Sequence, residues 1–219
     1  MKKMLISPFM GTLPAWIDKY RANCAHLKAS GWDVLIPNDL TDFEKRIRDT
    51  LGLNPTIPEN TCKVSDFRPA LGLLYADILK DYEFWGYTDL DCVYGDLSNF
   101  LSDEELAGCD MFVNDYDTNV LCGPFTLYRN NEKMNNLFRD FPGWQALMEN
   151  PNHHAFDEQG MGVAVRNHPE LRVIRKFSQG HSAMYGHDDI GIGYKDGKLY
   201  DHGEEIMLFH FNRHKVWPI

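Results

Sequence analysis

The chain has 219 residues, of which 43% are hydrophobic and 25% are charged, and its formal net charge at pH 7 is −10. This length supports one substantial domain with its own core, and the composition is that of an ordinary globular protein. The acidic surplus disfavours nonspecific nucleic-acid binding, which needs a basic footprint, although a bound cation can still let an acidic site accept a phosphate.

The N-terminal segment MKKMLISPFMGTLP is expected to begin with a strand rather than a signal peptide, because Pro8 and Gly11 break its short apolar run. No apolar run approaches the roughly 18–20 residues of a membrane span, so none is expected. The five cysteines form no CxxC pair, which favours reduced thiols and a cytoplasmic location.

Predicted strands and helices alternate from the start of the chain. Residues 2–9 and 32–39 are predicted strands, and each precedes apolar residues with helical spacing. The spacing of Leu71, Leu74 and Ile78 predicts an amphipathic helix. Further strands are expected at 84–96, 109–114, 123–130, 172–177 and near the C-terminus, with helices after 130 and near 157. This order predicts an α/β fold with a mixed, mainly parallel sheet flanked by helices.

The strand segment FWGYTDLDCVYGD (84–96) contains three aspartates, a residue type that is depleted in strands and costly to bury without a partner. Asp89 and Asp91 are two residues apart, so at the carboxyl end of a strand both carboxylates can reach one ion. Mg²⁺ and Mn²⁺ prefer such oxygen ligands. The alternative is that this pair starts a solvated turn. Asp96 is expected to cap the next helix or to orient a ligand.

Several segments together resemble a family of GT-A-fold, nucleotide-sugar glycosyltransferases found among bacterial surface-polysaccharide proteins and large algal viruses. The central match is DFRPALGLLYADILKDYEFWGYTDLDCVYGDLSNFL (66–101), and the others are SPFMGTLPAW (7–16), GPFTLYRN (123–130), FDEQG (156–160) and the terminal HF…K. The resemblance implies one GT-A-like domain, with a nucleotide-binding half over 1–100 and an acceptor and catalytic half over 101–219. For a viral member the location would be the host cytoplasm.

The same resemblance implies a metal site. Asp91 would be a direct ligand of Mn²⁺ or Mg²⁺, and Asp89 a ligand or a contact to ribose and metal. The ending HFNRHK is similar to that of a retaining group, in which the histidine completes the metal site and the lysine contacts the diphosphate. That implies His210 as a ligand, Lys215 as a phosphate contact and a retaining outcome. The alternative for His210 is a histidine at a strand end with no ligand.

Other nucleotide contacts are implied only by position in the resembled fold. Pro8, Phe9 and Thr12 follow the first strand and would border the base and ribose. Asp39 follows the second strand and would contact the nucleoside. Asp66 and Arg68 would meet the nucleotide or its diphosphate. The alternative for this last pair is a helix cap and a surface charge, and Pro69 in the first helical turn supports capping.

FDEQG contains the best candidates for the acid/base centre, Asp157 and Glu158. Glycosyl transfer needs a carboxylate, either as a base or to stabilise an oxocarbenium-like state. Neighbours on a helix face different ways, so one of the two is expected to reach the donor sugar, with Asp157 preferred. A solvated helix start is the alternative. Gly123 and Pro124 would allow close approach to the donor sugar or the acceptor, or simply form a turn.

The sequence therefore predicts a metal-dependent hexosyl- or deoxyhexosyltransferase that uses a nucleotide-sugar donor, with UDP-sugar favoured, and a glycan acceptor. A nucleotide-sugar-binding or nucleotidyltransferase-like protein without glycosyl transfer is the alternative. The loop SPFMGTLPAW argues against the latter, because it has one glycine and no lysine to hold phosphates. A non-catalytic module that keeps only the fold is a third possibility.

Overall fold

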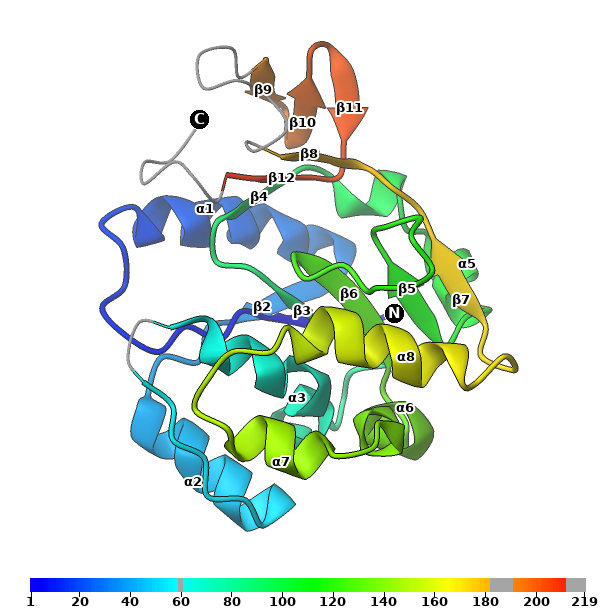
Figure 1. Cartoon of the computed structure of the whole chain (residues 1–219). Helices are drawn as coiled ribbons and strands as arrows, with labels where there is room; N and C mark the ends of the chain where they lie inside the picture. The colour runs from blue at the N-terminus through cyan, green and yellow to red at the C-terminus, as the bar shows by residue number, and fades with distance from the viewer. Residues whose placement is uncertain (59–60, 182–190, 212–219) are drawn as a thin grey trace.

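A computed structural model describes residues 1–58, 61–181 and 191–211. A six-stranded sheet forms its centre (Figure 1). Its strands in spatial order are β2 (Trp32–Leu35), β1 (Lys3–Ile6), β3 (Phe84–Thr88), β6 (Phe125–Arg129), β5 (Met111–Val113) and β7 (Val173–Arg175). β6 runs antiparallel to both of its neighbours, while the pairs β1–β2, β1–β3 and β5–β7 are parallel. The predicted fold class, a mixed and mainly parallel sheet, is confirmed.

The central sheet is buried on both faces, and this explains the dense apolar composition of its strands. Trp85 and Tyr87 of β3 enter one core, whereas Phe84 of the same strand enters the core on the opposite face. β5 shows the same alternation, with Met111 on one side and Phe112 on the other. Period-2 alternation therefore supplies two hydrophobic cores from one set of strands.

Helices cover the two faces unequally (Figure 1). One face carries α1 (Ile17–Leu27), which continues into η1 (Lys28–Ser30), and α5 (Asp103–Ala107). The other face carries α2 (Leu40–Leu51), η2 (Cys62–Ala70), α3 (Leu71–Leu74), α4 (Ala76–Leu79), α6 (Glu132–Asn136), η4 (Leu137–Asp140), α7 (Trp144–Glu149), η5 (Phe156–Gly160) and α8 (Met161–Arg166). Among the described residues, no helix is long and apolar enough to cross a bilayer.

Two small sheets lie above α1 in Figure 1. One consists of β4 (Cys92–Tyr94), β12 (Leu208–His210) and β8 (Gln179–His181), and the other of β9 (Ile192–Lys195), β10 (Lys198–Asp201) and β11 (Glu204–Ile206). A third apolar cluster, which includes Val93, Leu199 and Phe209, joins them. The C-terminal part of the described chain is thereby fixed beside the residues that directly follow β3.

The structure divides two elements that the sequence predicts as continuous. The helix expected around 71–79 breaks at Tyr75, which lies between α3 and α4. The predicted strand segment 84–96 contains two strands, β3 and β4, which belong to different sheets. The expected helix near 157 begins as the π-helical turn η5 and continues as α8. Asp96 is the N-cap of η3 (Leu97–Asn99), and its side chain accepts the N–H of Ser98, so the predicted capping role is confirmed.

Candidate active site

Asp89 and Asp91 lie in the short connection where the chain leaves the central sheet and enters β4. His210 ends β12, and the antiparallel pairing of β4 with β12 places it opposite Cys92, directly after Asp91. Its Nε2 atom lies 3.4 Å from Asp89 Oδ2 and 3.2 Å from Asp91 Oδ1. The three predicted metal ligands are therefore brought together from positions about 120 residues apart.

The ligand atoms of Asp89, Asp91 and His210 all lie within 4.8 Å of one another. Two carboxylates and one imidazole are a donor set that suits Mn²⁺, and the carboxylates alone suit Mg²⁺. Burial lowers the pKa of His210, but its hydrogen bond to Asp91 and the charges of both aspartates outweigh burial and raise the pKa above its ordinary value. The arrangement thus attracts positive charge, and these residues fit a divalent cation.

Arg68 joins this acidic group to a second one. Its guanidinium forms an ion pair with Asp89 and, through Nη1, with Asp157 Oδ2 at 2.9 Å. Nη1 also donates to the carbonyl of Gly123 at 3.1 Å. Arg68 is only 6% exposed and its guanidinium lies 5.5 Å from the ring of Tyr87, so the interpretation of Arg68 as a surface charge is wrong. The planar guanidinium of Arg68 thus holds the carboxylates of Asp89 and Asp157 at a fixed separation.

Asp157 and Glu158 both contribute to the site, although they are adjacent in sequence. Asp157 is 2% exposed, and burial raises its pKa to about 7, with the charge of Arg68 acting in the opposite direction. Burial also raises the pKa of Glu158, and the charge of Asp89 adds to this. Glu158 Oε1 accepts the N–H of Gly123 at 3.2 Å. Asp157 therefore gains or loses a proton near neutral pH, as a general acid or base must.

Gly123 lies against Glu158, and a Cβ at this position would overlap Glu158 Oε1. The sequence predicts that Gly123 allows close approach to the donor sugar or the acceptor. In the structure, the carboxylate of Glu158 occupies the space directly beside Gly123. Both Gly123 and Pro124 still line the site cavity.

Asp66 is fully buried and binds backbone of its own chain. Its carboxylate accepts the N–H groups of His154 and Phe156, at 3.0 Å and 2.9 Å. Ala155 between them has a φ of 49°, a left-handed conformation that turns both N–H groups toward one anion. The ammonium of Lys63 completes the contacts at 3.0 Å. The prediction that Asp66 contacts a nucleotide directly is wrong, because this buried carboxylate binds backbone and Lys63 instead. The residue fixes the backbone turn that begins η5 and thus positions Asp157.

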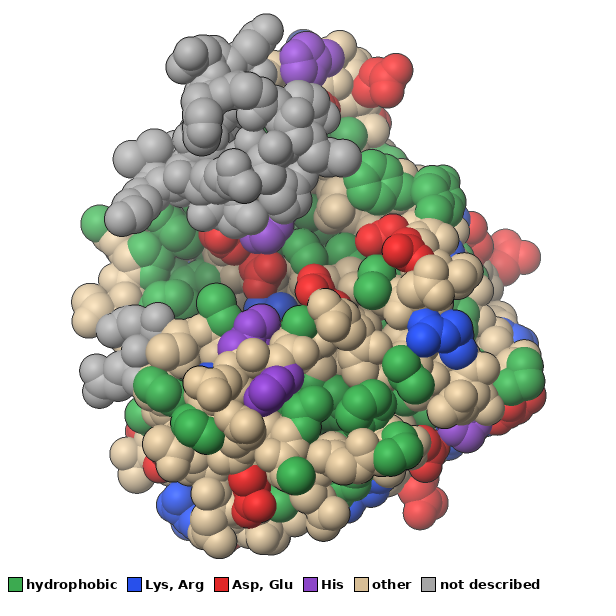
Figure 2. Space-filling model, viewed as in Figure 1, with side chains coloured by type: hydrophobic (Ala, Val, Ile, Leu, Met, Phe, Trp, Pro, Cys, Tyr) green, Lys and Arg blue, Asp and Glu red, His purple; other side chains and the backbone are tan. Residues whose placement is uncertain are grey.

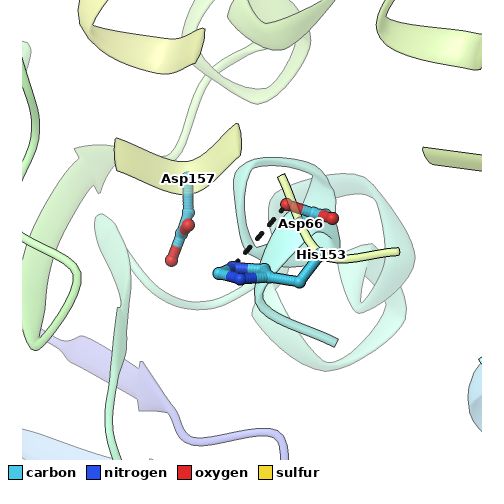
Figure 3. A group of neighbouring side chains, drawn as sticks. All are labelled: Asp66, His153 and Asp157. Atoms are coloured by element: carbon cyan, nitrogen blue, oxygen red, sulfur yellow. Dashed lines mark ion pairs between the residues drawn. The ribbon is translucent and has the colours of Figure 1, made fainter. Parts of the chain in front are cut away.

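Asp66, His153 and Asp157 form a second group of potential metal ligands (Figure 3). His153 Nε2 lies 3.9 Å from Asp66 Oδ1, the contact marked by the dashed line in Figure 3. The Asp66 carboxylate already binds two N–H groups and the Lys63 ammonium, and Asp157 is paired with Arg68. This group therefore fits a cation less well than Asp89, Asp91 and His210.

A cavity of about 670 Å³ connects these groups, a size typical of small-molecule sites. Figure 2 shows acidic and histidine side chains gathered in the hollow of this face, with a basic side chain below them. The titratable groups that line it are Arg68, Asp89, Asp91, Asp115, Asp157, Glu158, His153, His210, Cys62 and Cys122. Carboxylates exceed the basic groups, so a diphosphate in this cavity would need a cation to offset their charge.

Two of the four predicted nucleotide-contact residues of the first two loops lie in a separate hollow. Thr12 and Asp39 line a space of about 470 Å³. Asp39 caps α2 by accepting the N–H groups of Thr41 and Asp42. Pro8 is buried, and Phe9 packs against the core on the α1 face of the sheet. The structure thus brings together Thr12 and Asp39, and their contact with a nucleoside stays a prediction. Lys215 lies outside the described residues.

Sequence reasoning missed Asp115 and Gln179, which line the main cavity. Asp115 follows β5 and Gln179 begins β8, so the chain carries them to the cavity from two other strands. Neither residue belongs to a motif with the spacing of metal or substrate ligands. Only the position of Asp115 after a predicted strand could have indicated that it lines a binding site.

Residues 5–216 match the model of a family of unknown function, DUF6625. No curated protein matches the sequence. Among solved structures, a glycosyltransferase involved in the glycosylation of the major capsid of PBCV-1 is similar, with a TM-score of 0.59 and 9% identity over 98% of this chain and 96% of that one. The galactosyltransferase LgtC has a TM-score of 0.48 and 11% identity over 97% of this chain and 87% of that one. Mouse xyloside xylosyltransferase 1 has a TM-score of 0.41 and 10% identity over 99% of both chains. The likeness to the PBCV-1 glycosyltransferase, together with the sheet topology, supports a GT-A-type fold for the single domain.

Proposed function

The chain belongs to the DUF6625 family, and we propose that this member is a metal-dependent glycosyltransferase that moves a sugar from a nucleotide-sugar donor to a glycan acceptor. The observation that carries the proposal is the convergence of Asp89, Asp91 and His210 in a cavity that Arg68 and Asp157 also line. The fold of the PBCV-1 glycosyltransferase is compatible with it.

Asp89, Asp91 and His210 would hold Mn²⁺ or Mg²⁺. When bound, the cation would supply Lewis-acid stabilisation of the charge that develops on a nucleoside diphosphate leaving group. Asp91 and His210 would be direct ligands. Asp89 would be shared, since Oδ2 faces His210 and Oδ1 pairs with Arg68. Arg68 thereby keeps the metal-site carboxylate in place before the donor arrives.

Asp157 would act at the donor sugar. Its carboxylate lies in the cavity wall at a fixed distance from Asp89 through Arg68, and its pKa of about 7 lets it carry charge at neutral pH. A carboxylate there would stabilise the positive charge that forms at the anomeric carbon as the diphosphate leaves. Glu158, held by the N–H of Gly123, would position the backbone around this carbon. We propose a UDP-sugar donor. We also propose a retaining reaction, because the ending of the sequence is similar to that of a retaining group.

The first experiment is isothermal titration of UDP and GDP, with and without Mn²⁺, on the wild type and Asp91→Ala. Binding that requires both Mn²⁺ and Asp91 supports the proposal, and the preferred base identifies the donor. Asp96→Asn is the matched control, because this nearby carboxylate caps η3 and is expected to leave nucleotide binding unchanged. No binding of either nucleotide under any condition would remove the main support.

Transfer itself is tested with a panel of UDP-sugars and release of UDP as the signal. A protein that only binds nucleotide sugars would bind UDP with Mn²⁺ yet release none in the presence of any acceptor. NMR of the first-formed product, which reports its anomeric configuration, decides between retention and inversion.

A further inference from the structure

Two exposed aromatic side chains lie on segments that border the cavity. Tyr116 is 67% exposed and Phe177 is 38% exposed, although the structure buries most of the other large apolar side chains that it describes. Their ring centroids are 6.4 Å apart, with an interplanar angle of 37°. Asp115 and Gln179, their near neighbours in sequence, line the cavity itself. Tyr116 is adjacent to Asp115 and Phe177 is two residues from Gln179, so the backbone that carries the aromatic pair borders the cavity.

The loop that carries Tyr116 connects β5 to β6, and arginine side chains hold it in a fixed shape. Arg175 Nη1 donates to the carbonyls of Asp117 at 2.6 Å and Val120 at 3.3 Å. Arg166 Nη1 donates to the carbonyl of Asn119 at 2.7 Å. These contacts hold three carbonyls of one loop, so Tyr116 is presented by an ordered backbone despite its exposure.

The segment that carries Phe177 is tied to the same strand end. Asn114, the residue after β5, accepts the N–H of Ser178 at 2.9 Å through Oδ1. Its Nδ2 donates to Gln179 Oε1 at 3.2 Å. In Figure 1 the segment from β7 to β8 runs beside the β5–β6 connection. One asparagine thus fixes the spacing between the aromatic pair and the polar cavity wall.

An aromatic pair next to polar groups suits one class of ligand, a pyranose ring. The C–H groups of one face of such a ring pack against aromatic rings, and its hydroxyls bind carboxylates and amides. The cavity wall beside the pair supplies Asp115 and Gln179 for those hydroxyls. Exposed hydrophobic and acidic side chains lie next to each other at the upper right of the hollow in Figure 2.

The charge of the cavity restricts this sugar further. Five carboxylates line it, at Asp89, Asp91, Asp115, Asp157 and Glu158. A cation at the metal site would offset those nearest to it, whereas Asp115 lies on the same loop as Tyr116. An acidic sugar on the aromatic pair would face a like charge, which opposes binding.

We propose that Tyr116 and Phe177 form the acceptor subsite and that the acceptor is an uncharged pyranoside. This inference rests on the proposed glycosyl transfer, because it assigns the second substrate of that reaction. The ring of the acceptor packs against the aromatic pair, and its hydroxyls bind Asp115 and Gln179.

The test is saturation-transfer NMR on the full chain with UDP and Mn²⁺. The probes are the methyl β-pyranosides of glucose, galactose and xylose, with methyl β-glucuronide as the acidic counterpart. At least one neutral glycoside is expected to bind, with saturation strongest on the C–H groups of one ring face. The glucuronide is expected to bind at least about tenfold more weakly because of the like charge, and Asp115→Asn is expected to narrow that gap.

Aromatic truncation separates stacking from general damage. Tyr116→Ala and Phe177→Ala are each expected to weaken binding of the neutral glycoside by about tenfold or more, whereas Tyr116→Phe keeps it within about threefold. UDP affinity is expected to stay within about twofold in all three variants. Tyr194→Ala is the matched control, since Tyr194 is 37% exposed and contacts His26 rather than the cavity.

The outcomes distinguish the two proposals. If the wild type binds UDP with Mn²⁺ but no neutral glycoside, or if the alanine variants bind it unchanged, the acceptor subsite is refuted and the transferase proposal stands. If UDP does not bind, the transferase proposal fails, and the acceptor subsite fails with it.

Discussion

Replacing Arg68 with methionine is expected to destabilise the protein, and to do so more at alkaline than at acidic pH. Arg68 and Asp157 are 6% and 2% exposed, and Asp157 relies on this guanidinium for its counter-charge. Methionine retains most of the buried volume but removes the charge. The variant therefore leaves a buried carboxylate without its cation, a change that costs about 3–5 kcal/mol when the carboxylate is ionised.

The pH dependence follows from the pKa of Asp157, about 7 in the folded chain against 3.8 for an ordinary aspartate. A carboxyl whose folded pKa is raised contributes stability that is fully present below pH 3.8 and is lost as pH rises through about 7. Without Arg68 the folded pKa rises further. The free energies of unfolding of wild type and variant thus differ least near pH 6, where Asp157 is mostly protonated in both. Above pH 7 the difference grows by up to about 1.4 kcal/mol per pH unit.

The assay is urea denaturation at pH 6 and pH 9 without metal. We expect the loss in Arg68→Met to be larger at pH 9 by roughly 2–3 kcal/mol. Adding Asp157→Asn should abolish that pH dependence. A loss that is equal at both pH values, or that persists in the double variant, would refute the reasoning.

Arg46→Met is the matched control. Arg46 also pairs with two carboxylates, Asp42 and Asp77, and its guanidinium lies 4.7 Å from the ring of Tyr75. Its side chain is 24% exposed and its partners are 49% and 63% exposed, so water solvates the carboxylates that remain. Arg46→Met should lower the free energy of unfolding by about 1 kcal/mol or less, and this decrease should change little between pH 6 and pH 9.

Three further substitutions test the rest of the site. Asp157→Asn is expected to lower kcat by about 100-fold or more with UDP affinity nearly unchanged. The wild-type rate should decrease as the pH is lowered below about 7, because Asp157 then gains a proton. A rate that does not change with pH around 7 would contradict its role. Gly123→Ala is expected to displace Glu158 and to cost about 1–3 kcal/mol of folding stability by overpacking, whereas Gly108→Ala, where a Cβ meets nothing closer than 3.5 Å, should cost less in the same urea titration. Asp66→Asn is expected to cost about 2–4 kcal/mol, because charge-assisted bonds to two N–H groups and an ammonium are weakened; it should also lower kcat, and unchanged turnover would show that Asp157 does not need this support.

The sequence alone determined the fold class and pointed to the two aspartates of the candidate metal site. Strand segments such as 84–88 and 111–113 are rich in aromatic and branched residues, and period-2 alternation together with burial on both faces requires this composition. Asp89 and Asp91 indicated a metal site because aspartate is depleted in strands and is costly to bury without a partner. These are local signals, carried by residues close together in the chain.

Only the tertiary structure decided which distant residues meet. Arg68 lies 89 positions before Asp157, and no periodicity predicts that one guanidinium binds this carboxylate and Asp89 together. Asp66 looked like a helix cap or a ligand contact, but it holds the backbone on either side of Ala155. The pairing of β4 with β12 brought His210 to the aspartates. Such contacts arise from strand pairing and side-chain packing between remote segments, and the spacing of residues along the chain does not record them.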